Sequence, residues 1–325
     1  MLALALPAVA VDVAEWDRFL QRHFEQSGRI VDDGAGGASH SEGQGVGMLL
    51  AVHFQDRKTF ARLWQWTQQH LMVRDDGLLA WRWLPSTGID DRNNATDGDL
   101  LVAWALVRAG TRWNSREYIF AGTSLARTVR ERLVRQTDRG PILLPGIEGF
   151  ERDGVPLLNL SYWVYPAFAE LDRVDRAPEW GDLIKSGHRL LAEARFGRWG
   201  LPPDWLKHGE KLSLPEGRQA RFGYDAIRIP LYLLWSEAGS DALQPFRAFW
   251  SHFAGASFLP AWTNLTDDSV DSHDTLKGVR ALASVVTSYP EFRGVRLPDL
   301  DATQPYYSNA LLLLTKVMLW ERARR

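Results

Sequence analysis

The chain alternates between two kinds of helical segment, and this alternation strongly limits how it can fold. Segments of the first kind are apolar on nearly every side, which is typical of buried helices, whereas segments of the second kind carry a charged face and belong at a surface. The apolar segments are 41–54, 96–110, 159–171, 224–236, 276–287 and 306–322. The amphipathic segments are 13–24, 57–72, 115–135, 179–196 and 242–253.

This order predicts an all-α fold, an (α/α)6 barrel in which an outer ring of helices surrounds an inner ring. The first four apolar segments begin roughly 55 to 65 residues apart, as expected for a structural repeat. Six inner and five outer segments leave the barrel short of one outer helix, between residues 288 and 304. We find no run of alternating residues that predicts a strand. Residues 1–325 are predicted to form a single domain; an α-solenoid is the alternative, although its repeats are usually shorter.

Composition excludes several classes of protein. The 325 residues include no cysteine, which rules out disulfides, cysteine nucleophiles and thiolate metal sites. The net charge of −2 argues against a nucleic-acid partner, and no run approaches the ~18 apolar residues of a membrane span. The eight histidines form no metal-binding pair at helical spacing, so we expect neither a metal nor a cofactor. The chain is expected to be a monomer.

The unusual part of the composition is its 15 tryptophans. A buried indole N–H needs a hydrogen-bond partner, so tryptophan is a demanding residue with which to fill a core. The excess favours an aromatic-lined groove, and sugars are the ligands that most often use flat aromatic faces. A tryptophan-rich core is an equally good interpretation of the composition alone.

Residues 1–10 form an apolar start in which Ala8-Val9-Ala10 resembles a signal-peptidase site. We interpret this start as the remnant of an export signal, although it has no basic region. An apolar tail packed on the domain is the alternative.

Three acidic residues, Glu42, Asp97 and Asp225, lie at the starts of apolar segments. In a barrel these starts meet at one end and point towards the axis. Two carboxyls across an aromatic cleft suit glycoside hydrolysis, because one must be protonated to donate to the leaving oxygen and the other ionised to activate water or attack carbon. A carboxyl at a helix start is favoured in its ionised form, so burial and neighbouring carboxylates must raise the pKa of the acid.

Helix capping is the alternative explanation for these acids. Ser41 with Gln44 fits a capping box, and Thr96 opens the next apolar segment in a similar way. If Ser41 and Thr96 supply the caps, however, Glu42 and Asp97 have no capping role. A buried acid on an apolar helix is then costly unless it has a function.

Gly43, Gly45 and Gly47 fall in the first turns of the segment that follows Ser41. Glycine in a helix costs about 1 kcal/mol relative to alanine, so a close backbone approach is expected there. For Gly45 and Gly47 we expect close packing at the barrel centre, whereas Gly43 is the better candidate for contact with a ligand.

The sequence around these acids resembles glycoside hydrolase family 8, over nearly the whole chain. The segments that carry the resemblance are 41–45 (SEGQG), 95–100 (ATDGDL) with 103–106 (AWAL), and 224–228 (YDAIR). Segments 143–150, 159–162 and 203–205 are similar to the branch of the family that is encoded beside bacterial cellulose synthases. The resemblance is weakest after about residue 235.

This resemblance implies an inverting endo-β-1,4-glucanase with roles for particular residues. Glu42 would be the general acid, and Asp225 the general base that holds the water. Asp97 would bind and help distort the sugar at the cleavage point, and Tyr162 would help to position the water. Arg228 would hold a carboxylate in place, with an ordinary ion pair as the alternative.

Aromatic residues near these acids are candidate sugar platforms. Trp81 and Trp83 alternate as in an extended segment, so one of them would support a sugar while the other faces the core. Tyr224 is a third candidate platform.

The same resemblance implies a β-1,4-glucan substrate, a periplasmic or secreted location and the cellulose-synthase secretion complex as a partner. The residues themselves do not separate cellulose from xylan or mixed-linkage β-glucan. A non-catalytic glucan-binding protein on the same barrel is a further alternative, although both Glu42 and Asp225 are present.

Overall fold

The computed structural model describes residues 12–236, 239–292 and 295–325, so residues 1–10 and their interpretation lie outside the described part. Helices that overlap the apolar segments are α2 (Ser41–His53), α4 (Thr96–Trp113), α6 (Tyr165–Asp175), α8 (Arg228–Trp235), α10 (Lys277–Ser288) and α11 (Tyr306–Arg322). Helices that overlap the amphipathic segments are α1 (Val13–His23), α3 (Arg57–His70), α5 (Arg116–Leu133), α7 (Glu179–Glu193) and α9 (Ser240–His252).

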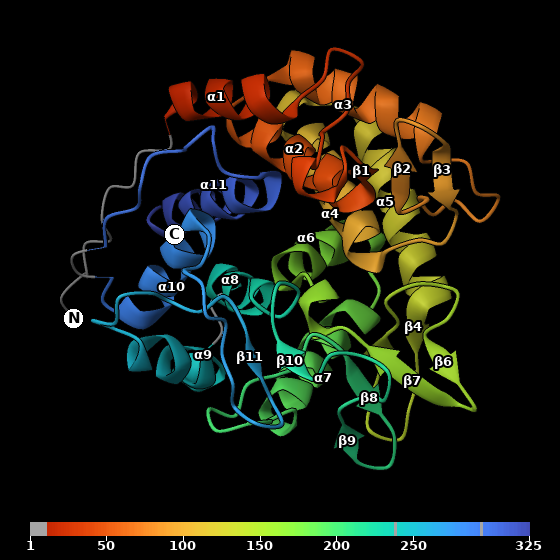
Figure 1. The fold of residues 1–325 in the computed structure, drawn as a ribbon. Helices are drawn as coiled ribbons and strands as arrows, with labels where there is room; N and C mark the ends of the chain where they lie inside the picture. The colour runs from red at the N-terminus through yellow and green to blue at the C-terminus, as the bar shows by residue number, and fades with distance from the viewer. Residues whose placement is uncertain (1–11, 237–238, 293–294) are drawn as a thin grey trace.

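The helices form two rings, as the sequence predicted. Helices α2, α4, α6, α8 and α11 contact one another in that order, and α11 returns to α2. Figure 1 shows these helices around the centre of the molecule, with α1, α3, α5 and α9 towards the periphery. Helix α10 packs on α9 and α11 and touches α8, while α8 and α11 also meet directly.

The segment expected to lack an outer helix joins α10 to α11. Its described residues, 289–292 and 295–305, contain turns and irregular chain and no helix. This agrees with the predicted barrel of inner and outer helices that lacks one outer member. None of the described helices is long and apolar enough to cross a membrane.

Short strands, which the sequence did not predict, lie in the loops between helices. Each has two to four residues, too few for an alternating pattern to be recognised. The strands pair antiparallel in four small sheets. Their bounds are β1 (Ser39–His40), β2 (Arg82–Leu84) and β3 (Gly88–Asp91); β4 (Val134–Arg135) and β5 (Ile142–Leu143); β6 (Glu151–Arg152), β7 (Val155–Leu158), β8 (Leu206–His208) and β9 (Leu212–Ser213); β10 (Arg221–Phe222) and β11 (Thr263–Asn264). Two short 3-10 helices, η1 (Asp33–Ala35) and η2 (Leu160–Tyr162), complete the elements.

One hydrophobic cluster runs through the described residues from Trp16 to Leu319. Tryptophan contributes heavily to it, which supports the interpretation of a tryptophan-rich core. Eight of the 15 tryptophans are buried: Trp16, Trp64, Trp66, Trp104, Trp163, Trp180, Trp235 and Trp250.

The helix starts are not capped as the sequence suggested. The Gln44 side chain accepts from Ile30 N at 2.6 Å and donates to Leu63 O at 3.1 Å, so it ties α2 to its neighbours instead of capping it. The Ser41 hydroxyl makes no hydrogen bond to any residue that the structure describes, and the Thr96 hydroxyl donates to Leu144 O at 2.6 Å. The capping box was therefore a wrong interpretation, since these polar groups are recruited by tertiary contacts.

The glycines of α2 mark its closest contacts. A Cβ on Gly45 would lie 2.6 Å from Leu101 Cβ and 2.9 Å from Val102 N, which confirms close packing between inner helices. A Cβ on Gly47 would lie 2.8 Å from Ile30 Cγ1, so this residue packs on the Ile30 side chain instead of the barrel centre. These distances leave no room for a side chain at either position.

We expect Gly45→Ala to lower the free energy of unfolding by about 1–3 kcal/mol, because the added methyl forces α2 and α4 apart. Urea denaturation would measure this change. Gly181→Ala in α7 is a matched control, since a Cβ there meets nothing within 4 Å. The control should stabilise the protein by up to about 1 kcal/mol through helix propensity. Equal stability of Gly45→Ala and the wild type would contradict the close packing.

Candidate active site

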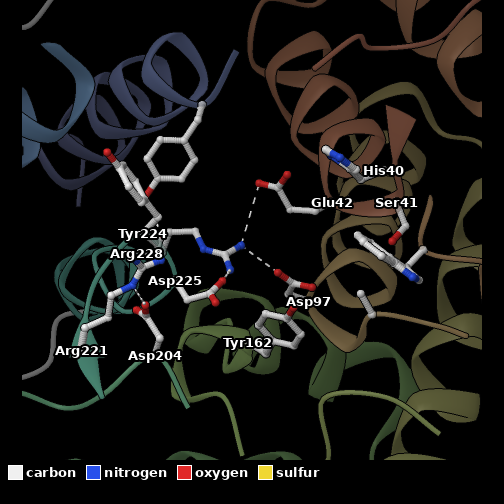
Figure 2. A pocket seen from close by; sticks show the side chains of 13 residues that line it. His40, Ser41, Glu42, Asp97, Tyr162, Asp204, Arg221, Tyr224, Asp225 and Arg228 are labelled. Carbon is white, nitrogen blue, oxygen red and sulfur yellow. Dashed lines mark hydrogen bonds and ion pairs between the residues drawn. The ribbon is translucent and has the colours of Figure 1, made fainter. Parts of the chain in front are cut away.

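A pocket of about 250 Å³ lies where α2 and α4 begin (Figure 2). It is formed by segments far apart in the sequence, because the helix starts of the inner ring converge there. Seven of the eight predicted site residues line it: Glu42, Trp81, Asp97, Tyr162, Tyr224, Asp225 and Arg228. Trp83 does not.

Glu42 and Asp97 each lie one residue inside an inner helix, on α2 and α4 respectively. Gly98 permits these two helix starts to touch, because a Cβ there would lie 2.0 Å from Ser41 Oγ and 2.8 Å from Glu42 N. Asp225 was expected to start a helix in the same way. The structure instead places it in a turn before α8, which begins only at Arg228.

The Arg228 guanidinium joins the three acids. Its Nη1 donates to Asp97 Oδ2 at 2.7 Å and lies 4.0 Å from Glu42 Oε1. Its Nη2 donates to Asp225 Oδ1 at 3.0 Å and to Ser161 Oγ at 3.1 Å. Arg228 therefore does not form an ordinary ion pair with a single partner, because Glu42, Asp97 and Asp225 share its guanidinium.

The three carboxyls differ in their access to solvent. The Asp97 side chain is 3% exposed, whereas those of Glu42 and Asp225 are 22% and 32% exposed. Glu42 and Asp225 thus have the greater access to a ligand or a water, while Asp97 lines the pocket with only a small part of its side chain.

Burial is the main influence on the pKa values of Glu42 and Asp97. It raises the pKa of Glu42 to about 7; the Arg228 charge opposes this rise, and the Asp97 and Asp32 charges add to it. Burial also raises the pKa of Asp97, again against Arg228. The carboxylates hold the pKa of Arg228 well above its ordinary value in spite of burial. Glu42 is accordingly a carboxyl that can carry a proton near neutral pH, as the sequence argument required.

Tyrosines surround the acids. The Arg228 guanidinium lies 5.6 Å from the centre of the Tyr162 ring, and burial, with the nearby Asp97 charge, raises the pKa of the Tyr162 hydroxyl well above its usual value. The Tyr306 hydroxyl donates to Glu42 Oε2 at 3.4 Å. Sequence reasoning missed Tyr306, although it opens the last apolar segment in the same way that the acids open the others.

The two candidate tryptophans point in different directions. The Trp81 ring lines the pocket, lies parallel to the His40 ring at 6.1 Å, and donates through Nε1 to Asp91 Oδ2 at 2.7 Å. Trp83 packs edge-on against Trp66 at 5.5 Å, beside the hydrophobic core.

Tyr224 lines the same pocket and is 39% exposed. Its ring meets the edge of the Tyr307 ring at 5.5 Å. The Tyr307 hydroxyl donates to the Tyr224 carbonyl at 2.7 Å, which ties the Asp225 turn to α11.

A second pocket of about 290 Å³ shares Trp81 and Tyr162 with the first and extends the cleft. Its wall contains Trp205, whose ring stacks on Phe150 at 5.7 Å and lies 4.1 Å from the Arg218 guanidinium. Sequence reasoning assigned no role to Phe150 or Trp205. Both lie in loops, where no periodic pattern marks a functional side chain.

Asp204 is a further pocket residue that the sequence reasoning left without a role. Burial and the charge of Asp225 raise its pKa to about 6, while bonds from Ala226 N and Arg221 oppose the rise.

As for a metal, the described residues contain no group of three or more His, Asp or Glu side chains placed to hold one.

Comparisons with known proteins identify the family of the chain. A model of Glycosyl hydrolases family 8 matches residues 1–323. The "Probable endoglucanase" of Novacetimonas hansenii is 38% identical over 325 residues, covering 97% of this chain and 93% of its own. An endoglucanase of Cellulomonas uda is 35% identical over 279 residues, covering 85% of this chain and 77% of its own.

Solved structures show the same fold. The endo-beta-1,4-glucanase CMCax of Acetobacter xylinum has a TM-score of 0.88 at 37% identity and covers 96% of this chain and 98% of its own. Endoglucanase Cel10 of Klebsiella pneumoniae, a family 8 glycosyl hydrolase, has a TM-score of 0.90 at 33% identity, covering 96% and 100%. The match of the family model over nearly the whole chain, together with these relatives, shows that the chain belongs to glycosyl hydrolase family 8.

Proposed function

We propose that this chain is an inverting endo-β-1,4-glucanase that cleaves cellulose-type chains by general acid–base catalysis. The observation that carries the proposal is one buried guanidinium, Arg228, that holds three carboxyls at the floor of a cleft with aromatic walls. The names of the relatives support β-1,4-glucan as the substrate class.

Glu42 is the general acid in this proposal. Because burial raises its pKa to about 7, it holds a proton under mildly acidic and neutral conditions. It donates that proton to the glycosidic oxygen as the bond to the anomeric carbon breaks. Developing charge on the leaving oxygen is thereby neutralised.

Asp225 is the general base, and its partly exposed carboxylate has room for a water. The water oxygen bonds to the anomeric carbon from the face opposite the leaving group, and its proton passes to Asp225, which inverts the configuration. Inverting enzymes hold their two carboxyls about 6.5–9.5 Å apart so that a water fits. Arg228 favours such a separation, because Glu42 and Asp225 approach different terminal nitrogens of its guanidinium.

Asp97 and Tyr162 support the reacting sugar. The enclosed Asp97 carboxylate, bonded to Arg228, accepts a hydrogen bond from a sugar hydroxyl and favours a distorted ring. Tyr162 lies beside Arg228 and helps to hold the water. Trp81 and Tyr224 supply the aromatic faces on which neighbouring sugars stack.

The proposal extends to the setting of the enzyme. The sequence resemblance to the branch encoded beside cellulose synthases supports an enzyme that acts in the periplasm or outside the cell on newly made glucan, with the cellulose-synthase secretion complex as its partner.

Glu42→Gln and Asp225→Asn should each lower kcat by about 10²–10⁴-fold with little change in KM, because each removes one proton transfer and keeps the shape of the side chain. Release of reducing ends from carboxymethylcellulose measures this loss. Xylan, chitosan and mixed-linkage β-glucan belong in the same panel. Hydrolysis of another polymer that both substitutions abolish would keep the mechanism and change the substrate. Binding without hydrolysis by the wild type would favour a non-catalytic glucan-binding protein.

The pH dependence of kcat/KM should show an alkaline limb near pH 7. Glu42 must be protonated to act, and its pKa is about 7, so activity is present below that pH and is lost as the pH rises through it. Asp32→Asn removes a negative charge that raises the pKa of Glu42, so it should move this limb to lower pH. An alkaline limb below pH 5 in the wild type would contradict the assignment of Glu42.

A further inference from the structure

Asp204 is hydrogen-bonded to the turn that carries Asp225, although it is not itself one of the three acids that share Arg228. It lies in the loop before β8 and is 4% exposed. Its Oδ1 accepts hydrogen bonds from Gly223 N and Ala226 N, both at 2.9 Å. Its Oδ2 accepts from Arg221 Nε at 3.1 Å.

These two backbone N–H groups lie on either side of Asp225 in the sequence. Because α8 begins only at Arg228, the backbone of Asp225 lies outside the regular hydrogen-bond ladder of a helix. A carboxylate that accepts from backbone N–H groups forms stronger hydrogen bonds than a neutral acceptor does. The turn has backbone bonds of its own, from Ile227 N to Gly223 O at 2.9 Å and from Arg228 N to Asp225 O at 3.1 Å, and Asp204 adds a partner for two of its N–H groups.

Gly223 makes this arrangement fit. A Cβ on Gly223 would lie 2.7 Å from Asp204 Oδ2 and 2.8 Å from Arg221 Nε. The carboxylate thus sits directly against the backbone of the turn, and any side chain at residue 223 would push it away.

Other contacts hold Asp225 from different sides. Arg228 bonds to its carboxylate, and Tyr307 bonds to the carbonyl of the preceding residue, Tyr224. These contacts fix the side chain and one carbonyl of the turn, whereas Asp204 fixes its N–H groups. The turn is thereby held between α11 and the loop before β8.

We propose that Asp204 is the positioning residue for the general base, setting the place of Asp225 through the Gly223 and Ala226 N–H groups. The inference rests on the proposed function, in which Asp225 takes the proton from water. A displacement of about 1 Å at a reacting group lowers the rate about 10²-fold. Loss of Asp204 should therefore reduce kcat while the sugar-binding surfaces remain in place.

The test compares kcat and KM of Asp204→Ala, Asp204→Asn and Arg221→Gln on the polymer that the wild type hydrolyses. Asp204→Ala should lower kcat about 10²-fold with KM nearly unchanged. Asp204→Asn should recover most of that loss, because its amide oxygen can accept the same two N–H groups. Arg221→Gln removes only the third bond and should lower kcat less than Asp204→Ala does.

Gly223→Ala provides a second variant that keeps the Asp204 carboxylate but crowds it. It should lower kcat as Asp204→Ala does, whereas Gly181→Ala should leave kcat unchanged. If Asp204→Ala does not fold, as judged by circular dichroism, the Asn and Gly223 variants decide the question. A crystal structure of Gly223→Ala should show a displaced Asp225.

Three kinetic results would overturn the proposal: full kcat in Asp204→Ala, an Asp204→Asn enzyme as impaired as Asp204→Ala, or an equal loss in Arg221→Gln. An undisplaced turn in the Gly223→Ala crystal structure would do the same. Failure of the proposed function has a different signature, since Asp225→Asn would then retain hydrolysis whatever the Asp204 variants do.

Discussion

The guanidinium of Arg228 determines the chemistry of the cleft, because one positive charge faces three carboxyls. With all three ionised, the cluster would carry excess negative charge in a partly buried place, which is costly. The carboxyl farthest from the guanidinium, that of Glu42 at 4.0 Å, is the one whose pKa burial raises to about 7. Burial is thus the main reason that Glu42 can act as an acid, and the Arg228 charge, which lies closer to the neighbouring carboxyls at 2.7 and 3.0 Å, opposes the rise without cancelling it.

A second arginine, Arg108 on α4, shows the contrasting case. It pairs with Glu170 of α6 and Glu321 of α11, each at 2.6 Å, and lies 4.3 Å from the centre of the Trp104 ring. Burial raises the pKa of Glu321, but the hydrogen bonds from Arg108 and Trp235 and the Arg108 charge together hold it below its ordinary value. The two close ion pairs of Arg108 link three inner helices. At Arg228, by contrast, three carboxyls share one guanidinium, and the Glu42 carboxyl keeps a proton that it can transfer.

The fold could be predicted from the sequence because buried and surface helices differ in how apolar and charged residues are distributed over ten or more positions. Glu42 and Asp97 could be found because a polar residue on an apolar helix is conspicuous. Asp225 was assigned to the pocket but placed on a helix, since an apolar run does not reveal that its first turn is irregular. Asp204 and Trp205 lie in loops, where position depends on tertiary contacts that leave no periodic signal.

The contact between the starts of α2 and α4 has a consequence for how this enzyme can change. Gly98 lies directly against Ser41 and Gly45 directly against Leu101, so the helices that carry Glu42 and Asp97 are in close backbone contact at these two places. The contact between the two helix starts then sets the spacing of those two carboxyls, and mutation elsewhere does not easily alter it. An enzyme that diverges towards new polysaccharides must keep this carboxyl spacing. Libraries for engineering specificity are therefore best directed at the rim loops and away from the helix starts.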